Sequence, residues 1–445
     1  MSRRAHGGPD ARALAHEVLV QVETAAAFAD VLLTHRLGRA ELAVRDRALA
    51  TELVYGTLVW QGRLDHHLRS LLHEPLERLD PPVRAALRLG LFQLLMLDRI
   101  PAYAAVDASV RLSGRRASGL VNAVLRRAAR AGRAGLALPD ATADPVERLS
   151  VEWSHPRWLV ERWIAELGHE DTTRLLAAND APPDLSIRTN RRRTTREALQ
   201  ATLADAGIVA RPGTYAPDAL VVSEGAHTLR DTKAWRDGLF SYQGEASQLV
   251  AALVDGPGLA HVLDVCAAPG GKTLAVAERL GDSGRRVVAL DQNRVGLGRL
   301  PDEARRLGIE GVLRIVGDAR ELPFTRTFDA VLVDAPCSGL GTLRRHPELK
   351  WRRRPDDIGR LAALQREIVA SAAGLVRPGG LLVYAVCTRT REETVAVVDW
   401  LVETSGRFVV EPLAMPGIDA DGMLRIAPHT HGLDGFFAAR LRARR

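Results

Sequence analysis

The sequence is poor in cysteine and in aromatic residues. Its 445 residues include only three cysteines, and Phe, Trp and Tyr together make up 4% of the chain. Three cysteines cannot build the disulfide framework of a small secreted domain, and no Cys/His spacing resembles a zinc site. We therefore expect no disulfide scaffold and no metal, and hydrophobic cores made from Leu, Val and Ala.

A long apolar run is also lacking. The first residues, MSRRAHGGPDAR, contain no apolar signal core, and no stretch approaches the ~18 uninterrupted apolar residues that a membrane-spanning helix needs. We therefore expect a protein without a membrane partner, located in the reducing cytoplasm. The length exceeds one ordinary domain and predicts two or three.

Lysine is the third scarce residue. It occurs only at Lys233, Lys272 and Lys350, so arginine supplies nearly all of the positive charge behind the net +7 and the pI near 9.8. Guanidinium groups bind phosphates and stack on bases, which indicates a nucleic-acid partner. A GC-rich genome that encodes Arg in place of Lys is the alternative explanation.

Residues 1–140 are predicted to form an all-α N-terminal bundle. The stretch ARALAHEVLVQVETAAAFADVLLTHRL has apolar residues at helical spacing, and Asp80 is a predicted N-cap before a helix that prolines open. The phrases RIPAYAAVDASVRLS and SGLVNAVLRR resemble the last helices of NusB-type RNA-binding domains. A helical bundle without an RNA role is the alternative.

Residues 141–250 are predicted to contain linker helices and a small α+β domain. HPRWLVERWIAEL has the pattern of a helix, whereas DLSIRTN and ARPGTYAPDALVV favour short strands. The basic run IRTNRRRTTRE either lines an RNA path or is ordinary surface.

Residues 251–445 are predicted to form an α/β domain. The apolar runs HVLDVCA, RVVALD, VLRIVGD, FDAVLVDAP and GLLVYAVCT alternate with helical segments. Strand and helix alternating at this spacing predict a Rossmann-like, mostly parallel sheet covered on both faces. Ligands on such sheets bind at the carboxyl ends of the strands.

The turn after the first of these strands, CAAPGGKT, resembles a P-loop only superficially. A P-loop needs glycine where this chain has Cys266, and Pro269 removes a backbone N–H that would bind phosphate. Asp291, at the end of the next strand, instead suits the ribose of an adenosine-bearing ligand.

Acidic residues end three successive strands, at Asp291, Asp318 and Asp334. Together with the Gly-rich turn, this pattern is typical of S-adenosylmethionine sites, so we expect that cofactor. The predicted cofactor-binding residues are Cys266, Ala267, Ala268, Pro269, Gly270, Gly271, Lys272, Asp291, Asp318 and Asp334.

DVCAAPGGKT, DAPCSG, YAVCTRTREE and GTLRRHPELKWRRR resemble the motifs of RNA cytosine-C5 methyltransferases of the Sun/RsmB (Fmu) type. With the NusB-like bundle, the resemblance covers nearly the whole chain. It implies methylation of a cytosine in small-subunit (16S) ribosomal RNA, of the nucleotide-967 class, and we expect a monomer. Methylation of transfer RNA and a non-catalytic RNA-binding assembly factor are the alternatives.

The chemistry that the resemblance implies needs a thiolate. Addition of sulfur to C6 of cytosine makes C5 nucleophilic enough to take a methyl group. In DNA cytosine-C5 methyltransferases the attacking cysteine follows a proline, which would select Cys337 of the stretch VDAPCSG. The RNA family instead implies Cys387 as nucleophile and Cys337 in product release.

Further residues have open roles. Asp334 either contacts the base near N3 or helps to bind the cofactor, and Lys272 either contacts the base or orients Asp334. Val386 stands where the family has Thr before the nucleophile, and Thr388 is a candidate source of the missing hydroxyl. The residues predicted to bind RNA phosphates are Arg344, Arg345, Lys350, Arg352 and Arg353, although a solvated basic loop would have the same composition.

Overall fold

The computed structural model describes residues 10–25, 27–281, 284–412 and 421–445. The chain divides into two units. One comprises Met1–Ala181 together with Leu343–Arg353, and the other comprises Pro182–Thr342 together with Arg354–Arg445. The short segment 343–353 therefore packs with the first unit, although in sequence it lies between two strands of the second.

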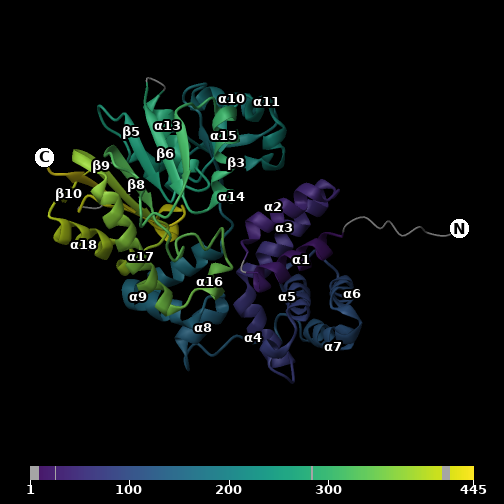
Figure 1. The fold of residues 1–445 in the computed structure, drawn as a ribbon. Coiled ribbons are helices and arrows are strands. Elements are labelled where there is room, and N and C mark those ends of the chain that lie inside the picture. The colour runs from purple at the N-terminus through teal and green to yellow at the C-terminus, as the bar shows by residue number, and fades with distance from the viewer. Residues whose placement is uncertain (1–9, 26, 282–283, 413–420) are drawn as a thin grey trace. The chain divides into compact units, whose positions relative to one another are not determined.

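The first unit is all-α, as the helical spacing of its apolar residues predicts, so the expected N-terminal helical bundle is confirmed (Figure 1). Asp80 occupies the predicted N-cap position of the helix that begins at Pro81, although its side chain makes no capping hydrogen bond. The helices are α1 (Ala11–Thr24), α2 (Ala29–Arg39), α3 (Val44–Val59), α4 (Gln61–Leu71), α5 (Pro81–Met96), α6 (Ala102–Leu112), α7 (Gly114–Ala131), α8 (Pro145–Glu152), α9 (Arg157–Asp180) and α16 (Leu349–Arg352).

The second unit begins with a small antiparallel sheet of order β2-β3-β1-β4. This is the expected α+β region. Leu220 and Phe240 of the sheet pack against Leu199 and Leu203 of the helix α10 in one buried cluster. The elements are β1 (Leu185–Thr189), α10 (Arg196–Asp205), β2 (Val209–Pro212), β3 (Ala219–Glu224), α11 (Lys233–Arg236), β4 (Phe240–Tyr242) and α12 (Glu245–Ala252).

A mostly parallel sheet forms the rest of the second unit, which confirms the predicted Rossmann-like fold. Its order is β10-β12-β9-β8-β5-β6-β7, with β11 paired to β12. Strands β5 to β9 are mutually parallel, whereas β10, β11 and β12 are antiparallel additions. The strands are β5 (His261–Val265), β6 (Arg286–Asp291), β7 (Val312–Val316), β8 (Phe328–Asp334), β9 (Val376–Val386), β10 (Phe408–Val410), β11 (Leu424–Ile426) and β12 (Phe436–Ala443).

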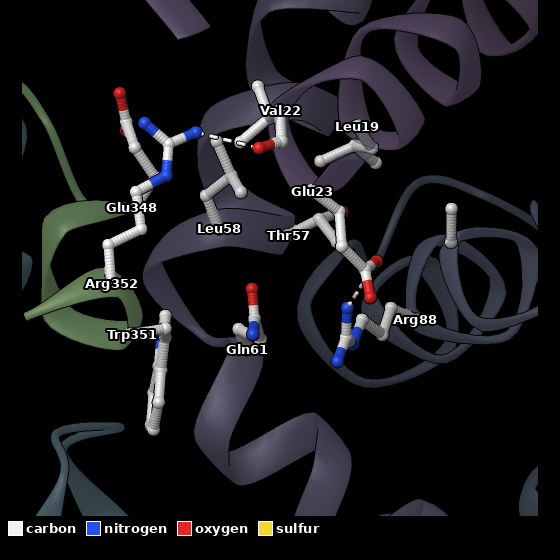
Figure 2. Close-up of a pocket in the computed structure, with 11 residues that line it drawn as sticks. Leu19, Val22, Glu23, Thr57, Leu58, Gln61, Arg88, Glu348, Trp351 and Arg352 are labelled. Carbon is white, nitrogen blue, oxygen red and sulfur yellow. Dashed lines mark hydrogen bonds and ion pairs between the residues drawn. The ribbon is translucent and has the colours of Figure 1, made fainter. Parts of the chain in front are cut away.

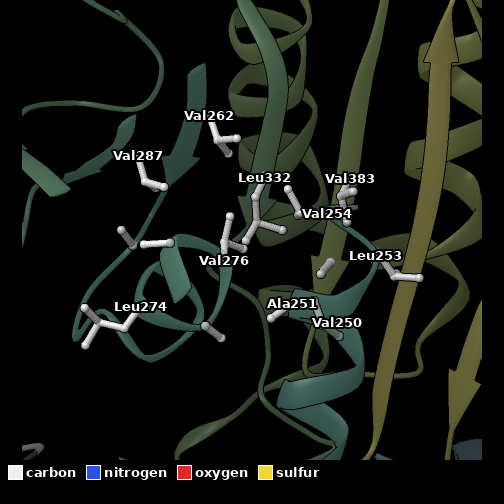
Figure 3. Close-up of a cluster of buried hydrophobic side chains, with 14 of the residues drawn as sticks. Val250, Ala251, Leu253, Val254, Val262, Leu274, Val276, Val287, Leu332 and Val383 are labelled. Atoms are coloured by element: carbon white, nitrogen blue, oxygen red, sulfur yellow. The ribbon is translucent and has the colours of Figure 1, made fainter. Parts of the chain in front are cut away.

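Helices cover both faces of the large sheet. Because side chains alternate along a strand, Val262 and Leu332 contribute to one buried cluster, whereas Leu263 contributes to the other. Figure 3 shows the first cluster, in which Val250 of α12 and Val276 of α13 lie against the strands. The remaining helices are α13 (Gly271–Leu280), α14 (Arg294–Leu297), α15 (Leu300–Leu307), α17 (Pro355–Gly374), α18 (Val395–Ser405) and α19 (Pro428–His431).

The strand order positions a ligand site. The chain runs from β5 outward to β6 and β7, then crosses back to β8 on the other side of β5. The carboxyl ends of β5 and β8 therefore flank the point at which the connections reverse direction, where parallel sheets bind ligands. Within the described part of the chain, no helix is long and apolar enough to cross a membrane. The domain boundaries at residues 140 and 250 stay a prediction.

Candidate active site

The loop between β5 and α13 contains the Gly-rich turn. Its backbone is bound to the next strand, because Ala267 N donates to Leu290 O at 3.0 Å and Ala268 N donates to the Asp291 carboxylate at 2.9 Å. Cys266 has φ +63°, an unusual conformation for a non-glycine residue. Apart from its chain neighbours and the backbone of its own helix, no atom lies within 4 Å of the position that a Cβ on Gly271 would take, so open space remains at the start of α13.

The predicted acidic residues occupy the carboxyl ends of the strands. Asp291 ends β6 and Asp334 ends β8, while Asp318 follows β7 by two residues. Asp318 differs from the other two, since its carboxylate is bound by the Arg320 side chain. That hydrogen bond and the Arg320 charge lower the pKa of Asp318 to about 2, so it is a carboxylate at neutral pH.

Lys272 and Asp334 form an ion pair, with Nζ 2.6 Å from Oδ2. Burial lowers the pKa of Lys272, but the charge of Asp334 and its hydrogen bond outweigh burial and leave the pKa raised. Lys272 Nζ also lies 5.1 Å from the centre of the Phe436 ring. The two candidate catalytic residues are therefore in contact, and the lysine keeps its charge.

Behind this pair lies Asp264, a fully buried carboxyl group of β5. Burial raises its pKa to about 7, although a 2.6 Å hydrogen bond from Thr273 acts in the opposite direction. Asp264 thus packs beneath the turn, and was not singled out from the sequence.

The two candidate catalytic cysteines lie side by side. Cys337 Sγ and Cys387 Sγ are 3.3 Å apart, on the loops that follow the neighbouring strands β8 and β9. The hydrogen bond with Cys387 and burial both raise the pKa of the Cys337 thiol, and the charges of Cys387 and Glu393 add to them. Cys266 is largely buried, and burial raises the pKa of its thiol as well. The structure therefore pairs two of the three cysteines and separates the third.

A buried polar network joins the two cysteine-bearing loops, and sequence reasoning missed its centre. Val386 is an apolar core residue of β9, so it offers no hydroxyl. Thr388 Oγ1 lies 2.8 Å from Ser338 Oγ, and Ser338 in turn donates to the carboxylate of Glu393. The stretch TRTREE, within a motif already noted, was the only signal for Glu393 in the sequence.

The segment predicted to bind RNA contains a lysine that is buried in the helical unit. Lys350 is fully buried within the helical unit, where its ammonium contacts Asp180 Oδ1 at 2.5 Å and donates to the carbonyls of Val59 and Ser154. An ammonium has three N–H donors, and all three are used. The structure therefore argues against the predicted phosphate contact of Lys350 and gives the residue a structural place.

Arg352 is half-buried in the same unit. Its guanidinium donates to the carbonyl of Val22 at 2.7 Å (Figure 2). It also donates to the carbonyl of Ala27 at 2.6 Å. It lines a cavity of about 250 Å³, in which Arg88 is neutralised by Asp65 and Glu23. Arg344, Arg345 and Arg353 are partly buried. RNA contact by these four arginines stays a prediction.

The arrangement in the second unit suits an adenosine-bearing methyl donor. Asp291 accepts one backbone hydrogen bond on each oxygen, from Ala268 and Asn293, and so keeps lone pairs for ribose hydroxyls. Open space lies beside the Gly-rich turn, and two thiols and a lysine–carboxylate pair occupy the neighbouring strand ends. No cluster of three or more His, Cys, Asp or Glu side chains suited to a metal ion occurs in the part of the chain that the structure describes.

Comparison with known families agrees with this arrangement. Residues 253–442 match the family model of the 16S rRNA methyltransferase RsmB/F, and residues 9–130 match the NusB family. Residues 155–228 match the ferredoxin-like domain of RsmF/B-like methyltransferases. A relative from Bacillus subtilis (strain 168), a probable ribosomal RNA small subunit methyltransferase B, is 36% identical across 97% of this chain and 98% of its own length. The chain belongs to the RsmB/F methyltransferase family.

A further relative and two solved structures are also similar to this chain. The ribosomal RNA small subunit methyltransferase B of Pseudomonas putida is 38% identical over 89% of this chain and 90% of its own. The crystal structure of PH0851 has a TM-score of 0.84 and 28% identity, and covers 97% of this chain and 98% of that one. The structure of NSun6 from Pyrococcus horikoshii with SFG shares the fold, with a TM-score of 0.58 over 65% of this chain and 98% of that one. The predicted family, fold class and S-adenosylmethionine cofactor are confirmed.

Proposed function

We propose that this RsmB/F-family methyltransferase methylates C5 of a cytosine in small-subunit ribosomal RNA, of the nucleotide-967 class, through a covalent adduct of Cys387 with C6. The observation that carries the proposal is the pair of thiols 3.3 Å apart, which follows two neighbouring strands beside the Lys272–Asp334 pair. The names of the relatives support ribosomal RNA as the substrate.

The target base must leave its stack to reach these groups. In the proposed reaction, Cys387 Sγ attacks C6 and the ring electrons make C5 a nucleophile. Asp334 faces N3 of the ring, and Lys272 orients its carboxylate through the 2.6 Å ion pair. C5 would then form a bond to the electrophilic methyl group that a bound methyl donor supplies, while the methyl–sulfur bond breaks and its electron pair stays on the donor's sulfur. Loss of the C5 proton to a base expels Cys387 as a thiolate, so the ring regains aromaticity with a methyl group at C5. Cys337 assists this release.

S-adenosylmethionine supplies an electrophilic methyl group when it is bound. We assign it to the Gly-rich turn of residues 266–271, with Lys272 at its end and with Asp291, Asp318 and Asp334 at the strand ends. Asp291 would accept from ribose hydroxyls, and the turn places backbone groups beside open space. The proposal also includes Arg344, Arg345, Arg352 and Arg353 as RNA contacts, a monomeric protein and a cytoplasmic location.

Bisulfite sequencing of ribosomal and transfer RNA from a deletion strain tests the substrate. We expect the loss of one methylated cytosine in 16S rRNA, restored by the wild-type gene. Loss of a transfer-RNA methylation instead would move the target to tRNA. Unchanged methylation in both RNAs would leave a non-catalytic assembly factor and contradict the proposal.

Cysteine variants test the adduct. Cys387→Ala should abolish turnover without trapping RNA, because no sulfur remains to attack C6. Cys337→Ala should accumulate a protein–RNA adduct, seen as a slower band on a denaturing gel, because release is impaired. The reverse pattern would exchange the two assignments.

A further inference from the structure

One buried carboxylate holds the two cysteine-bearing loops together. We call residues 335–342 the Cys337 loop and residues 387–394 the Cys387 loop. Glu393 lies in the second of these, within a short 3-10 helix (Arg391–Glu393), and is 0% exposed. A carboxylate in such a place is costly unless its oxygens are satisfied by hydrogen bonds.

Four donors satisfy it, and they come from three different segments. Ser338 N and Gln365 Nε2 donate to Oε1 at 2.8 and 3.0 Å. Ser338 Oγ and Thr390 Oγ1 donate to Oε2 at 2.5 and 2.8 Å. Two donors on each oxygen is the full set that an ionised carboxylate accepts. Ser338, directly after Cys337, is therefore bound to Glu393 through both its backbone and its side chain.

The surroundings hold Glu393 itself in place. Tyr384 Oη lies 2.7 Å from the carbonyl oxygen of Glu393, and Gln365 Nε2 donates to Pro336 O at 2.9 Å as well. The two loops are also joined by a backbone hydrogen bond, which Gly341 N donates to Cys387 O at 3.0 Å. The 3.3 Å approach of the two sulfurs thus rests on a braced network centred on Glu393.

We propose that Glu393 is a positioning residue that fixes Cys337 against Cys387 and keeps Cys337 protonated, so that only Cys387 acts as the nucleophile. The proposal rests on the proposed function for the roles of the two thiols. The two sulfurs lie only 3.3 Å apart, so their positions alone do not decide which of them attacks the base. A difference in protonation between the two thiols would decide it.

The surroundings of Cys337 favour its protonated form, and the charge of Glu393 adds to that effect. Cys387, Glu393 and Tyr384 are titratable groups that interact with Cys337. The hydrogen bond with Cys387 and burial raise the pKa of Cys337 most, followed by the charges of Cys387 and Glu393. A fixed negative charge beside a thiol opposes a second one, so Cys337 stays a thiol while Cys387 reacts.

Alkylation of the protein without RNA tests this directly. The rate of iodoacetamide labelling at each cysteine is measured from pH 6 to 10 by peptide mass spectrometry. Glu393→Gln keeps the shape of the side chain but removes its charge. We expect Cys337 to label about tenfold faster at pH 8 than in the wild type, because removal of the charge lowers the pKa of its thiol. An unchanged Cys337 profile would overturn the proposal.

Controls separate this effect from loss of structure. Glu392→Gln makes the same change one residue earlier and should leave the Cys337 profile as in the wild type. Cys266 should stay unlabelled in every variant, since unfolding would expose all three cysteines together. Glu393→Asp keeps the charge with a shorter side chain, so its rate of Cys337 labelling at pH 8 should match the wild type. A tenfold faster rate in Glu393→Asp would contradict the role of charge, and this comparison with the wild type holds even if the Gln variant does not fold.

A second readout uses the RNA. Glu393→Gln should accumulate the protein–RNA adduct expected for Cys337→Ala, because a displaced Cys337 no longer assists release. Wild-type protein that methylates no RNA would refute the proposed function, and the labelling profiles would still decide the role of Glu393. Normal release by Glu393→Gln in an active enzyme would refute the positioning role alone.

Discussion

Two lysine–aspartate pairs, one in each unit, share a geometry and differ in surroundings. Lys350 Nζ lies 2.5 Å from Asp180 in the helical unit, and Lys272 Nζ lies 2.6 Å from Asp334 at the end of β8. The side chains of the first pair are 0% and 3% exposed, whereas those of the second are 13% and 27% exposed. The first pair is sealed, and the second is open to a ligand.

Burial lowers the pKa of the lysine in both pairs, but the partner's charge outweighs burial in only one of them. For Lys350, burial lowers the pKa and the charge of Asp180 offsets this only in part, while burial raises the pKa of Asp180 to about 7. For Lys272, the charge of Asp334 prevails and the pKa is raised. The same two side chains therefore form a buried structural pair in one place and a charged, partly exposed pair in the other.

Lys350→Met should have the largest effect on stability. Removal of one partner leaves Asp180 buried without its cation, so we expect the free energy of unfolding to fall by about 3–5 kcal/mol. Urea denaturation followed by circular dichroism measures the loss. The double variant Lys350→Met/Asp180→Leu should recover most of it, since no buried charge then remains. A double variant as unstable as the single one would show that the loss does not come from an unpaired buried charge on Asp180.

Lys272→Met should reduce activity strongly and stability only slightly, in contrast to Lys350→Met. We expect methyl transfer to fall by about 100-fold, because the general acid–base and electrostatic contribution of such a group is of that order. Single-turnover kinetics with RNA measures this, and the urea midpoint should change less than for Lys350→Met because Lys272 and Asp334 are partly solvated. Wild-type activity in the Lys272→Met enzyme would contradict a role of Lys272 in methyl transfer.

The pH dependence of stability should distinguish the pairs further. The folded-state pKa of Asp180 is about 7, well above the roughly 3.9 of an unfolded aspartate. Its protonated form therefore contributes stability below about pH 4, and that contribution is lost as the pH rises to 7, by at most about 1.4 kcal/mol per pH unit. The lowered pKa of Lys350 acts separately, in the alkaline range.

Urea midpoints of the wild type and of the Lys350→Met/Asp180→Leu double variant, taken between pH 4 and 8, test this. The wild type should lose stability relative to the double variant as the pH rises from 4 to 7. Parallel curves would show that Asp180 does not titrate in this window.

The third lysine gives the smallest expected effect. Lys233 lies 2.6 Å from Asp237, but their side chains are 83% and 43% exposed. Lys233→Met should change the free energy of unfolding by no more than about 0.5 kcal/mol, and 0.5 M salt should remove most of that change. A larger loss would mean that distance alone predicts the strength of these pairs.

The fold was largely readable from the sequence, because it depends on periodic patterns. Helical spacing marked the bundle, and apolar runs that stop at Asp291 and Asp334 marked parallel strands. The motifs around Cys337 and Cys387 placed the thiols on neighbouring strand ends. Lys350 was misread, because a basic run in sequence has the same composition whether its side chains face solvent or a buried carboxylate.

The sequence by itself determined the order of strands and helices, the family and the two thiols, since local periodicity and short motifs encode all three. The tertiary structure alone decided that Lys350 pairs with Asp180, 170 residues away along the chain, and that Glu393 reaches Ser338, 55 residues away. Such pairs have no local signature, because their energies come from burial and from the partners that long-range packing brings to them.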